Sequence, residues 1–224
     1  MDFLKLIRSF GDLLFEVLTW LIYFPRTLWL VLRHPLKMIT YSDHEQTDAE
    51  DEQYTDTLSP PLLLLLTLLL LHGLELAFGT LPQIPAKNEE VRTFFASDEH
   101  FVMLRAFLFG LLPLFAALRY VRARGLPLER KNLRPAFYGQ CYLAAIYAFM
   151  LWLVTSYDIV GMRAGAEPIL FAASTLWYWT VQTMQFRRAL TISWPRAIAN
   201  TLWVYFEAAF YLVVVALILS GGGA

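Results

Sequence analysis

Residues 62–74 read LLLLLTLLLLHGL, and this segment constrains the fold more than any other part of the chain. A leucine run of this kind cannot remain in water, and with its apolar flank up to Phe78 it reaches roughly 20 residues, enough to cross a bilayer. A helix at the surface of a soluble protein would carry polar residues along one face, and here Thr67 is the only polar residue before His72. The chain is therefore predicted to be an integral membrane protein.

The overall composition fits that prediction and narrows the class of protein. Hydrophobic residues make up 58% of the 224-residue chain and aromatic residues 16%, values ordinary for a polytopic membrane protein. A chain of this length is expected to form one membrane domain with a short soluble part. Cys141 is the only cysteine, which excludes an intrachain disulfide and a thiol-metal cluster, and its apolar surroundings predict a small buried side chain.

Residues 1–40 are predicted to form amphipathic helices that lie in the membrane interface on the cytoplasmic side. Four charged residues recur at helical spacing on one face, and apolar residues occupy the other. Pro25 ends or kinks the first helix, and residues 26–38 repeat the arrangement. The alternative is that residues 10–32 form a further transmembrane helix, which the charges inside that window disfavour. The four charged residues are Lys5, Arg8, Asp12 and Glu16.

Residues 41–59 are predicted to be an acidic, solvated linker. Seven Asp and Glu residues occur there without any Lys or Arg. His44 lies among these acids, but the spacing fits no metal-ligand pattern, so the segment is interpreted as a charge run. At its end, Ser59 supplies a helix N-cap and Pro60 a first-turn proline for the leucine-rich span.

Residues 60–224 are predicted to form a transmembrane domain of five helices. The leucine run is the first span, and four further apolar segments follow it. The predicted fold class is therefore all-α, a polytopic membrane helix bundle of five transmembrane helices preceded by an amphipathic interfacial helical region. The expected spans cover residues 61–79, 101–118, 136–157, 169–186 and 197–220.

Basic residues determine the expected orientation in the membrane. With the N-terminus in the cytoplasm, fourteen Lys and Arg residues fall on the cytoplasmic side and three fall outside, not counting Arg105 inside the second span. Because cytoplasmic loops carry an excess of basic residues, we expect a multi-pass protein of the cell inner (plasma) membrane with an outer C-terminus. The fourteen include Arg119, Arg122, Arg124, Arg130, Lys131 and Arg134 between spans two and three, and the three are Lys87, Arg92 and Arg163.

Polar residues inside the predicted spans are the candidate functional residues, because a charged one costs roughly 2.5–3.5 kcal/mol at mid-bilayer on insertion scales. Glu75 lies toward the outer end of span one and Arg105 near the outer start of span two, so a structural ion pair between these antiparallel helices is expected. Gln140 and Gln182, nearer the cytoplasmic side, are interpreted as helix-to-helix hydrogen-bond partners, and Asn200 is interpreted in the same way.

His72 and Glu207 are the pair with the greatest functional interest. Both fall near the bilayer midplane, one on span one and the other on span five. A carboxylate and a histidine at that depth could relay a proton or line a polar cavity. The alternative, which we prefer, is a mutually satisfied buried pair or a protonated Glu207.

An enzymatic function is not expected. The sequence contains no HExxH, GxSxG or Walker motif and no run of aspartates that would bind phosphate through Mg²⁺. We therefore predict no catalytic residue, no cofactor and no metal site. The arginines between Arg119 and Arg134 are explained by topology and by anionic lipid headgroups, and no nucleic-acid partner is expected.

The phrase FPRTLWLVLRHP at residues 24–35 and the first span that begins Ser59-Pro60-Pro61 carry a family resemblance. In these features and in its layout the chain resembles bacterial members of the Yip1-like family. The resemblance implies five membrane spans with a cytoplasmic N-terminus. The Asp-Leu-Tyr-Gly-Pro signature of the eukaryotic branch is absent, so that branch's vesicle-trafficking role and small-GTPase partners are not implied.

Two hypotheses for the function follow. The first is a non-enzymatic inner-membrane protein of Yip1-like type that organises protein or lipid partners, with the bilayer, anionic headgroups, and a membrane-protein partner or a second copy as its contacts. It predicts that loss of residues 1–40 abolishes function while Glu207→Gln leaves it intact. The alternative is a small transporter or permease that uses a midplane polar centre of His72 and Glu207. It predicts a pH-dependent flux that Glu207→Gln eliminates.

Overall fold

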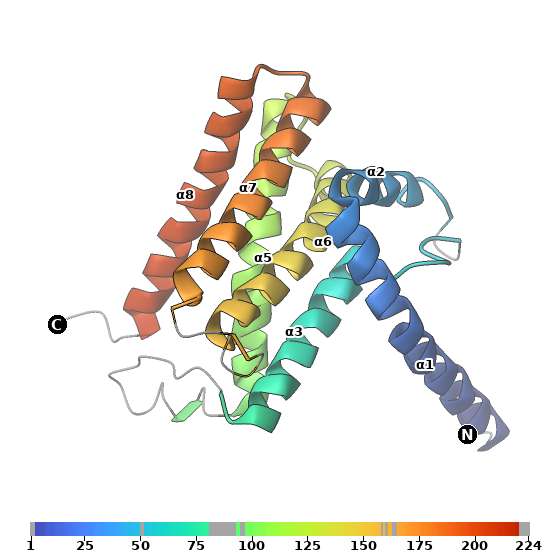
Figure 1. The fold of residues 1–224 in the computed structure, drawn as a ribbon. Coiled ribbons are helices and arrows are strands. Elements are labelled where there is room, and N and C mark those ends of the chain that lie inside the picture. The colour runs from blue at the N-terminus through green and yellow to red at the C-terminus, as the bar shows by residue number, and fades with distance from the viewer. Residues whose placement is uncertain are drawn as a thin grey trace.

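The structure is a computed structural model, and it describes residues 3–49, 52–80, 93–94, 97–157, 159, 161–162 and 165–219, with side chains from Phe10 to Ile218. These residues form helices, turns and bends without a strand, which confirms the all-α prediction. The helices shown in Figure 1 are α1 (Phe3–Arg33), α2 (Pro35–Glu45), α3 (Pro60–Phe78), α5 (Asp98–Ala123), α6 (Arg130–Thr155), α7 (Glu167–Leu190) and α8 (Trp194–Leu219).

Within the described residues, five helices are long and apolar enough to cross a membrane, which supports an integral membrane protein. They are the Phe10–Arg33 part of α1, then α3, α5, α6 and the Trp194–Ile218 part of α8. This set differs from the expected one, because it includes α1 and omits α7. Helix α7 has 24 residues and occupies the fourth predicted position, but its tryptophan, tyrosine and glutamine side chains lower its apolar character.

Helix α6 is the central element of the bundle, and α2, α3, α5 and α7 all pack against it. Its small residues Ala144, Ala145 and Ala148 are buried, and so is the thiol of Cys141, as predicted. At Gly139 the neighbouring helix approaches very closely, since a Cβ there would lie 2.9 Å from a methyl carbon of Ile39 on α2. Small side chains therefore allow α6 to contact so many neighbours at once.

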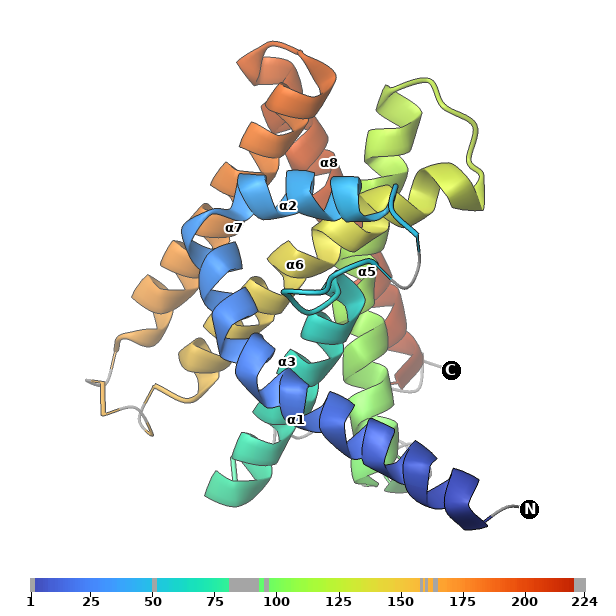
Figure 2. The same ribbon diagram turned by 90° about the vertical axis from the view of Figure 1, so that its right-hand side faces the viewer.

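Helices α1 and α2 are arranged quite differently from the bundle. Figures 1 and 2 show α2 lying across one end of the bundle, while α1 runs obliquely past α3 and extends away from it. Met38 and Ile39 bury α2 against the bundle. In the described part of α1, only Thr27 and Val31 are buried. From Phe10 to Phe24, α1 therefore leaves most of its apolar surface exposed.

The predicted linker is more ordered than its composition indicated. Helix α2 continues to Glu45, past the expected boundary at residue 40. Leu58 is then held from two sides, because its carbonyl accepts a hydrogen bond from the Tyr142 hydroxyl at 2.8 Å and its N–H donates to Thr27 Oγ1 at 3.1 Å. Since these partners belong to α6 and α1, the expectation of a solvated linker is wrong for its last residues. Glu50 and Asp51 lie outside the described residues.

Basic residues of the connecting loops gather at one end of the bundle, as the sequence predicted. The connections between α5 and α6 and between α7 and α8 lie at the same end of the bundle as α2, and most described basic residues lie near that end (Figure 1). Arg105 lies toward the opposite end, while Lys87, Arg92 and Arg163 fall outside the described residues, as do the side chains of Lys5 and Arg8. The basic loops agree with the predicted orientation, but α1 runs away from α2, so its N-terminal part lies toward the opposite end of the bundle (Figures 1 and 2). The orientation stays a prediction.

Candidate functional site

The predicted ion pair between spans one and two is confirmed. Arg105 Nη2 lies 2.8 Å from Glu75 Oε2 and donates a hydrogen bond to Oε1 at 3.0 Å. The two side chains are 12% and 4% exposed, respectively. The guanidinium also lies 5.1 Å from the centroid of the Phe101 ring. A charge-assisted contact this well shielded links α3 firmly to α5.

The predicted pairing of His72 with Glu207 is not observed. His72 is buried on α3, and its Nε2 lies 3.6 Å from Asp98 Oδ1 at the start of α5, too long for a hydrogen bond. Glu207 accepts a 2.8 Å hydrogen bond from Trp203 Nε1, one turn earlier on α8. Helices α3 and α8 lie on opposite flanks of the bundle in Figure 1, so the two residues do not form a shared polar centre.

The two buried glutamines do not have the role predicted for them. Both amide atoms of Gln182 and Oε1 of Gln140 are buried without a hydrogen-bond partner in the described structure. Polar links between helices occur elsewhere: Arg119 Nε donates to Asn200 Oδ1 at 2.6 Å, which confirms the prediction for Asn200. Unsatisfied buried amides are costly, and ordered water is the usual remedy.

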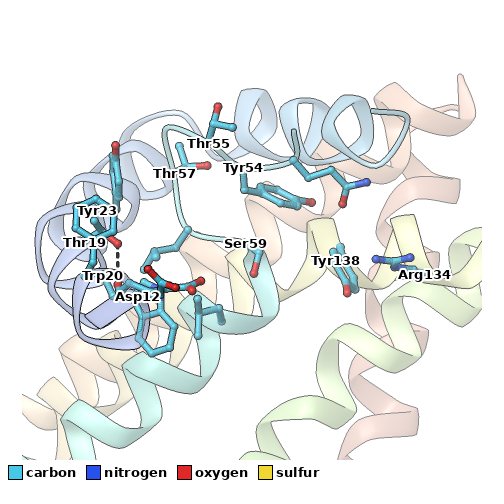
Figure 3. A pocket seen from close by; sticks show the side chains of 15 residues that line it. Asp12, Thr19, Trp20, Tyr23, Tyr54, Thr55, Thr57, Ser59, Arg134 and Tyr138 are labelled. Carbon is cyan, nitrogen blue, oxygen red and sulfur yellow. Dashed lines mark hydrogen bonds between the residues drawn. The ribbon is translucent and has the colours of Figure 1, made fainter. Parts of the chain in front are cut away.

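A polar pocket lies instead between α1, the segment before α3, and the start of α6. It is a cavity of about 720 Å³, shown in Figure 3. One wall is a stripe of polar side chains on α1 at positions i, i+4, i+7 and i+11, which lie on a single helical face. We call this set the α1 polar stripe, and its members are Asp12, Glu16, Thr19 and Tyr23.

The opposite wall of this pocket carries the complementary charge. Arg134 of α6 lines it, with the guanidinium carbon 5.2 Å from the centroid of the Tyr138 ring. Figure 3 places Tyr54 and Ser59 between this wall and the α1 polar stripe. The pocket therefore offers carboxylates on one side, a guanidinium on the other, and hydroxyl groups and aromatic rings between them.

Hydrogen bonds fix the segment that covers the pocket. The Tyr54 hydroxyl lies 3.0 Å from Ser42 Oγ and accepts a 3.0 Å hydrogen bond from Gln46 Nε2. Tyr41 donates to Asp56 Oδ1 at 2.8 Å. Burial raises the pKa of both phenols, so each stays neutral and able to donate. The cover is thus built from α2 and its following segment rather than from a mobile loop.

Sequence reasoning identified part of the α1 polar stripe but not the pocket. Asp12 and Glu16 were recognised as one polar face, which was expected to meet water at the membrane surface. Thr19 and Tyr23 continue the helical spacing of Asp12 and Glu16. This spacing indicates a polar surface that extends farther along α1. Within the described residues, no group of three or more His, Cys, Asp or Glu could hold a metal ion.

No protein-family model matches the chain, and neither does any curated protein or solved structure. The resemblance to the Yip1-like family therefore stays a prediction from the sequence. The function has to be argued from the geometry of the chain itself.

Proposed function

We propose that this protein is a non-enzymatic integral membrane protein that organises protein or lipid partners through α1 and the pocket beneath it. The observation that carries the proposal is the two-sided character of α1. Its polar stripe lines the pocket, while large apolar side chains outside the pocket, such as Phe10 and Ile22, remain 67% and 70% exposed. A helix with so little of its apolar face covered presents a surface for lipid or for another membrane helix.

We place the end of the bundle that carries α2 in the cytoplasm, at the inner (plasma) membrane. The basic residues near this end support that placement under the positive-inside rule. A second cavity of about 580 Å³ at the same end is lined by Arg187, Arg188 and Trp194, with the Arg187 guanidinium 4.3 Å from the Trp194 ring centroid. Anionic lipid headgroups are the natural contacts of such a surface.

The transporter alternative is less well supported by the geometry. It needs His72 and Glu207 in one polar centre, and His72 is turned to Asp98 while Glu207 is bonded to Trp203. Reconstituted vesicles that enclose a pH-sensitive dye test this directly. We expect wild-type vesicles to show no proton flux above that of empty vesicles; a flux that disappears with Glu207→Gln would instead establish the transporter.

The organising role is tested by photo-crosslinking in intact membranes. A photoreactive residue replaces Ile22 of α1 in one variant and Ile169 of α7 in the other; these two side chains are 70% and 71% exposed. We expect a discrete adduct from position 22, with a membrane protein or a retained lipid, and only diffuse bulk-lipid labelling from position 169. Equal diffuse labelling from both positions would refute a partner-binding α1.

Removal of residues 1–24 provides a second test of the same proposal. This deletion ends before Thr27 and Val31, the two buried residues in the described part of α1, and it spares α2, which packs on α6. The bundle should therefore remain folded while partner association is lost. In the truncated protein, a photoreactive residue replaces Trp29. If it still crosslinks the partner found from position 22, residues 1–24 of α1 are not the binding segment.

A further inference from the structure

Helix α8 carries an acidic side chain at the middle of its length. Glu207 is the only charged residue between Arg196 and the end of the helix at Leu219. At 1.5 Å per residue it lies about 20 Å from the first residue of α8, near the centre of this membrane-spanning helix. Its side chain is partly exposed, on a helix that forms one flank of the bundle (Figure 1). An acidic group at this depth is costly in hydrocarbon and indicates a site that a partner satisfies.

The contacts of Glu207 within the chain leave its charge uncompensated. One carboxylate oxygen accepts a 2.8 Å hydrogen bond from Trp203 Nε1, and the part of the chain that the structure describes contains no ion pair to it. Arg119 contacts the same tryptophan, with its guanidinium carbon 5.7 Å from the ring centroid, but it donates to Asn200, two turns nearer the start of α8. Because an ionised carboxylate accepts several hydrogen bonds, Glu207 can still receive a charged donor.

The surface beside Glu207 has the spacing of a helix-packing face. Large side chains follow one another there at intervals of three and four residues, which places them in one row, as in the seam between two packed helices. Glu207 lies at the edge of this row, next to Phe206 and three residues before Phe210. We call the row and Glu207 the α8 outer face. The exposed side chains of the row are Trp203, Phe206, Phe210 and Val213.

Neither lipid nor a second copy complements the α8 outer face. Acyl chains offer no hydrogen-bond donor at this depth. A symmetric parallel dimer through this face would place a second Glu207 at the same depth, so two like charges would meet. The exposed side of α7 differs, because no charged residue lies between Glu167 and Arg187 and lipid alone can cover it. The charge of Glu207 therefore favours a helix that brings a base.

We propose that the α8 outer face binds a membrane-spanning helix of another protein that carries a Lys, Arg or His near its middle. Glu207 forms an ion pair with that base, and the hydrogen bond from Trp203 orients the carboxylate. Phe206 and Phe210 pack against the apolar side chains of the partner helix. This surface is separate from α1, so it goes beyond the proposed role of that helix.

The first test uses the full-length protein, labelled and reconstituted in phosphatidylcholine vesicles, with two labelled polyleucine transmembrane peptides. One peptide has a central lysine and the other has leucine there, and energy transfer between the labels measures association. We expect the wild type to bind the lysine peptide about tenfold more tightly, because a hydrogen bond to a charged group is gained. Glu207→Gln should remove most of this preference, and Glu207→Asp, which keeps the charge, should retain it. Glu16→Gln, which removes a carboxyl of α1, is the control and should keep the preference.

The second test uses photo-crosslinking in intact membranes, with a photoreactive residue in place of Phe210 or, as the control, of Leu176 on α7. These side chains are 56% and 63% exposed, and they lie at the same distance from the helix end farther from α2, nine residues before Leu219 and nine after Glu167. We expect a discrete protein adduct from position 210 alone. The captured segment should contain a Lys, Arg or His within its membrane span, and Glu207→Gln should eliminate the adduct.

Several results would overturn the proposal. They are equal binding of the two peptides, an adduct from position 210 with the mass of a second copy, diffuse lipid labelling from both positions, and an adduct that persists in Glu207→Gln. These failures are separable from failure of the proposed function. The adduct from position 22 of α1 should be unchanged in Glu207→Gln, since α1 and α8 lie on opposite sides of the bundle (Figure 1).

Discussion

The buried pair of Glu75 and Arg105 gives the sharpest energetic prediction, because both side chains are shielded and in direct contact with each other. The guanidinium contacts both carboxylate oxygens, at 3.0 and 2.8 Å. Arg105→Gln leaves the carboxylate, only 4% exposed, without its counter-charge. Removal of one partner from a buried ion pair typically costs about 3–5 kcal/mol, and we expect Arg105→Gln to fall in that range.

Substitution of the other partner, Glu75, should lower the free energy of unfolding by less. Glu75→Gln retains an amide oxygen that accepts a hydrogen bond from Arg105, and the arginine can extend its charge toward the membrane surface. We expect about 1.5–3 kcal/mol for this variant, the usual net value of a hydrogen bond to a charged group. In the double variant Glu75→Gln/Arg105→Gln the two amides can bond to each other, so no buried charge remains. It should be more stable than Arg105→Gln alone.

Equilibrium unfolding in mixed micelles of the wild type, the two single variants and the double variant measures the coupling free energy. We expect at least about 2 kcal/mol between Glu75 and Arg105. The matched control is Glu129 with Lys131, whose charged atoms are also 2.8 Å apart but whose side chains are 51% and 74% exposed. Exposed pairs typically couple by about 0.2–1 kcal/mol. Additivity at Glu75 and Arg105 within about 0.5 kcal/mol would refute the reasoning.

Three further outcomes are expected. Tyr142→Phe removes the hydrogen bond to the linker carbonyl and should destabilise the protein by about 1–3 kcal/mol in the same unfolding assay, because that buried carbonyl loses its donor. Gly139→Ala should increase proteolytic cleavage between α2 and α3 at least severalfold, since the added methyl meets Ile39 at 2.9 Å; unchanged cleavage would show that α2 shifts freely. Because the native cysteine is buried, Thr47→Cys should react with an impermeant maleimide only after membrane disruption, and Met162→Cys should react in intact cells.

The ion pair and the missing midplane pair show how far a sequence can predict a membrane site. Depth along a helix follows from counting residues, so the level shared by Glu75 and Arg105 was predictable. Which helices are neighbours does not follow from depth. His72 and Glu207 were placed at similar depth, but α5 lies beside α3 while α8 does not, and His72 is turned to Asp98.

The ordered segment before α3 escaped prediction for a related reason. Its acidic composition describes its affinity for water, and nothing local reveals that a distant tyrosine holds it. Tyr142 is 84 residues away from Leu58, whose carbonyl it binds, and Thr27 is 31 residues away in the other direction. Because long-range partners with ordinary side chains leave no local pattern, the linker and the pocket it covers were visible only in three dimensions.

The placement of α1 depends on what fills the space beneath it. From Phe10 to Phe24 no side chain of α1 is buried, so direct packing contributes little to holding this part of the helix against the bundle. Asp12 and Glu16 must nevertheless avoid hydrocarbon, where each carboxylate costs roughly 2.5–3.5 kcal/mol. The pocket that they line offers hydroxyl groups instead of hydrocarbon, among them those of Thr19, Tyr23 and Tyr54. On this reasoning α1 keeps its polar stripe toward the pocket, and a partner that binds this helix meets its exposed apolar side chains.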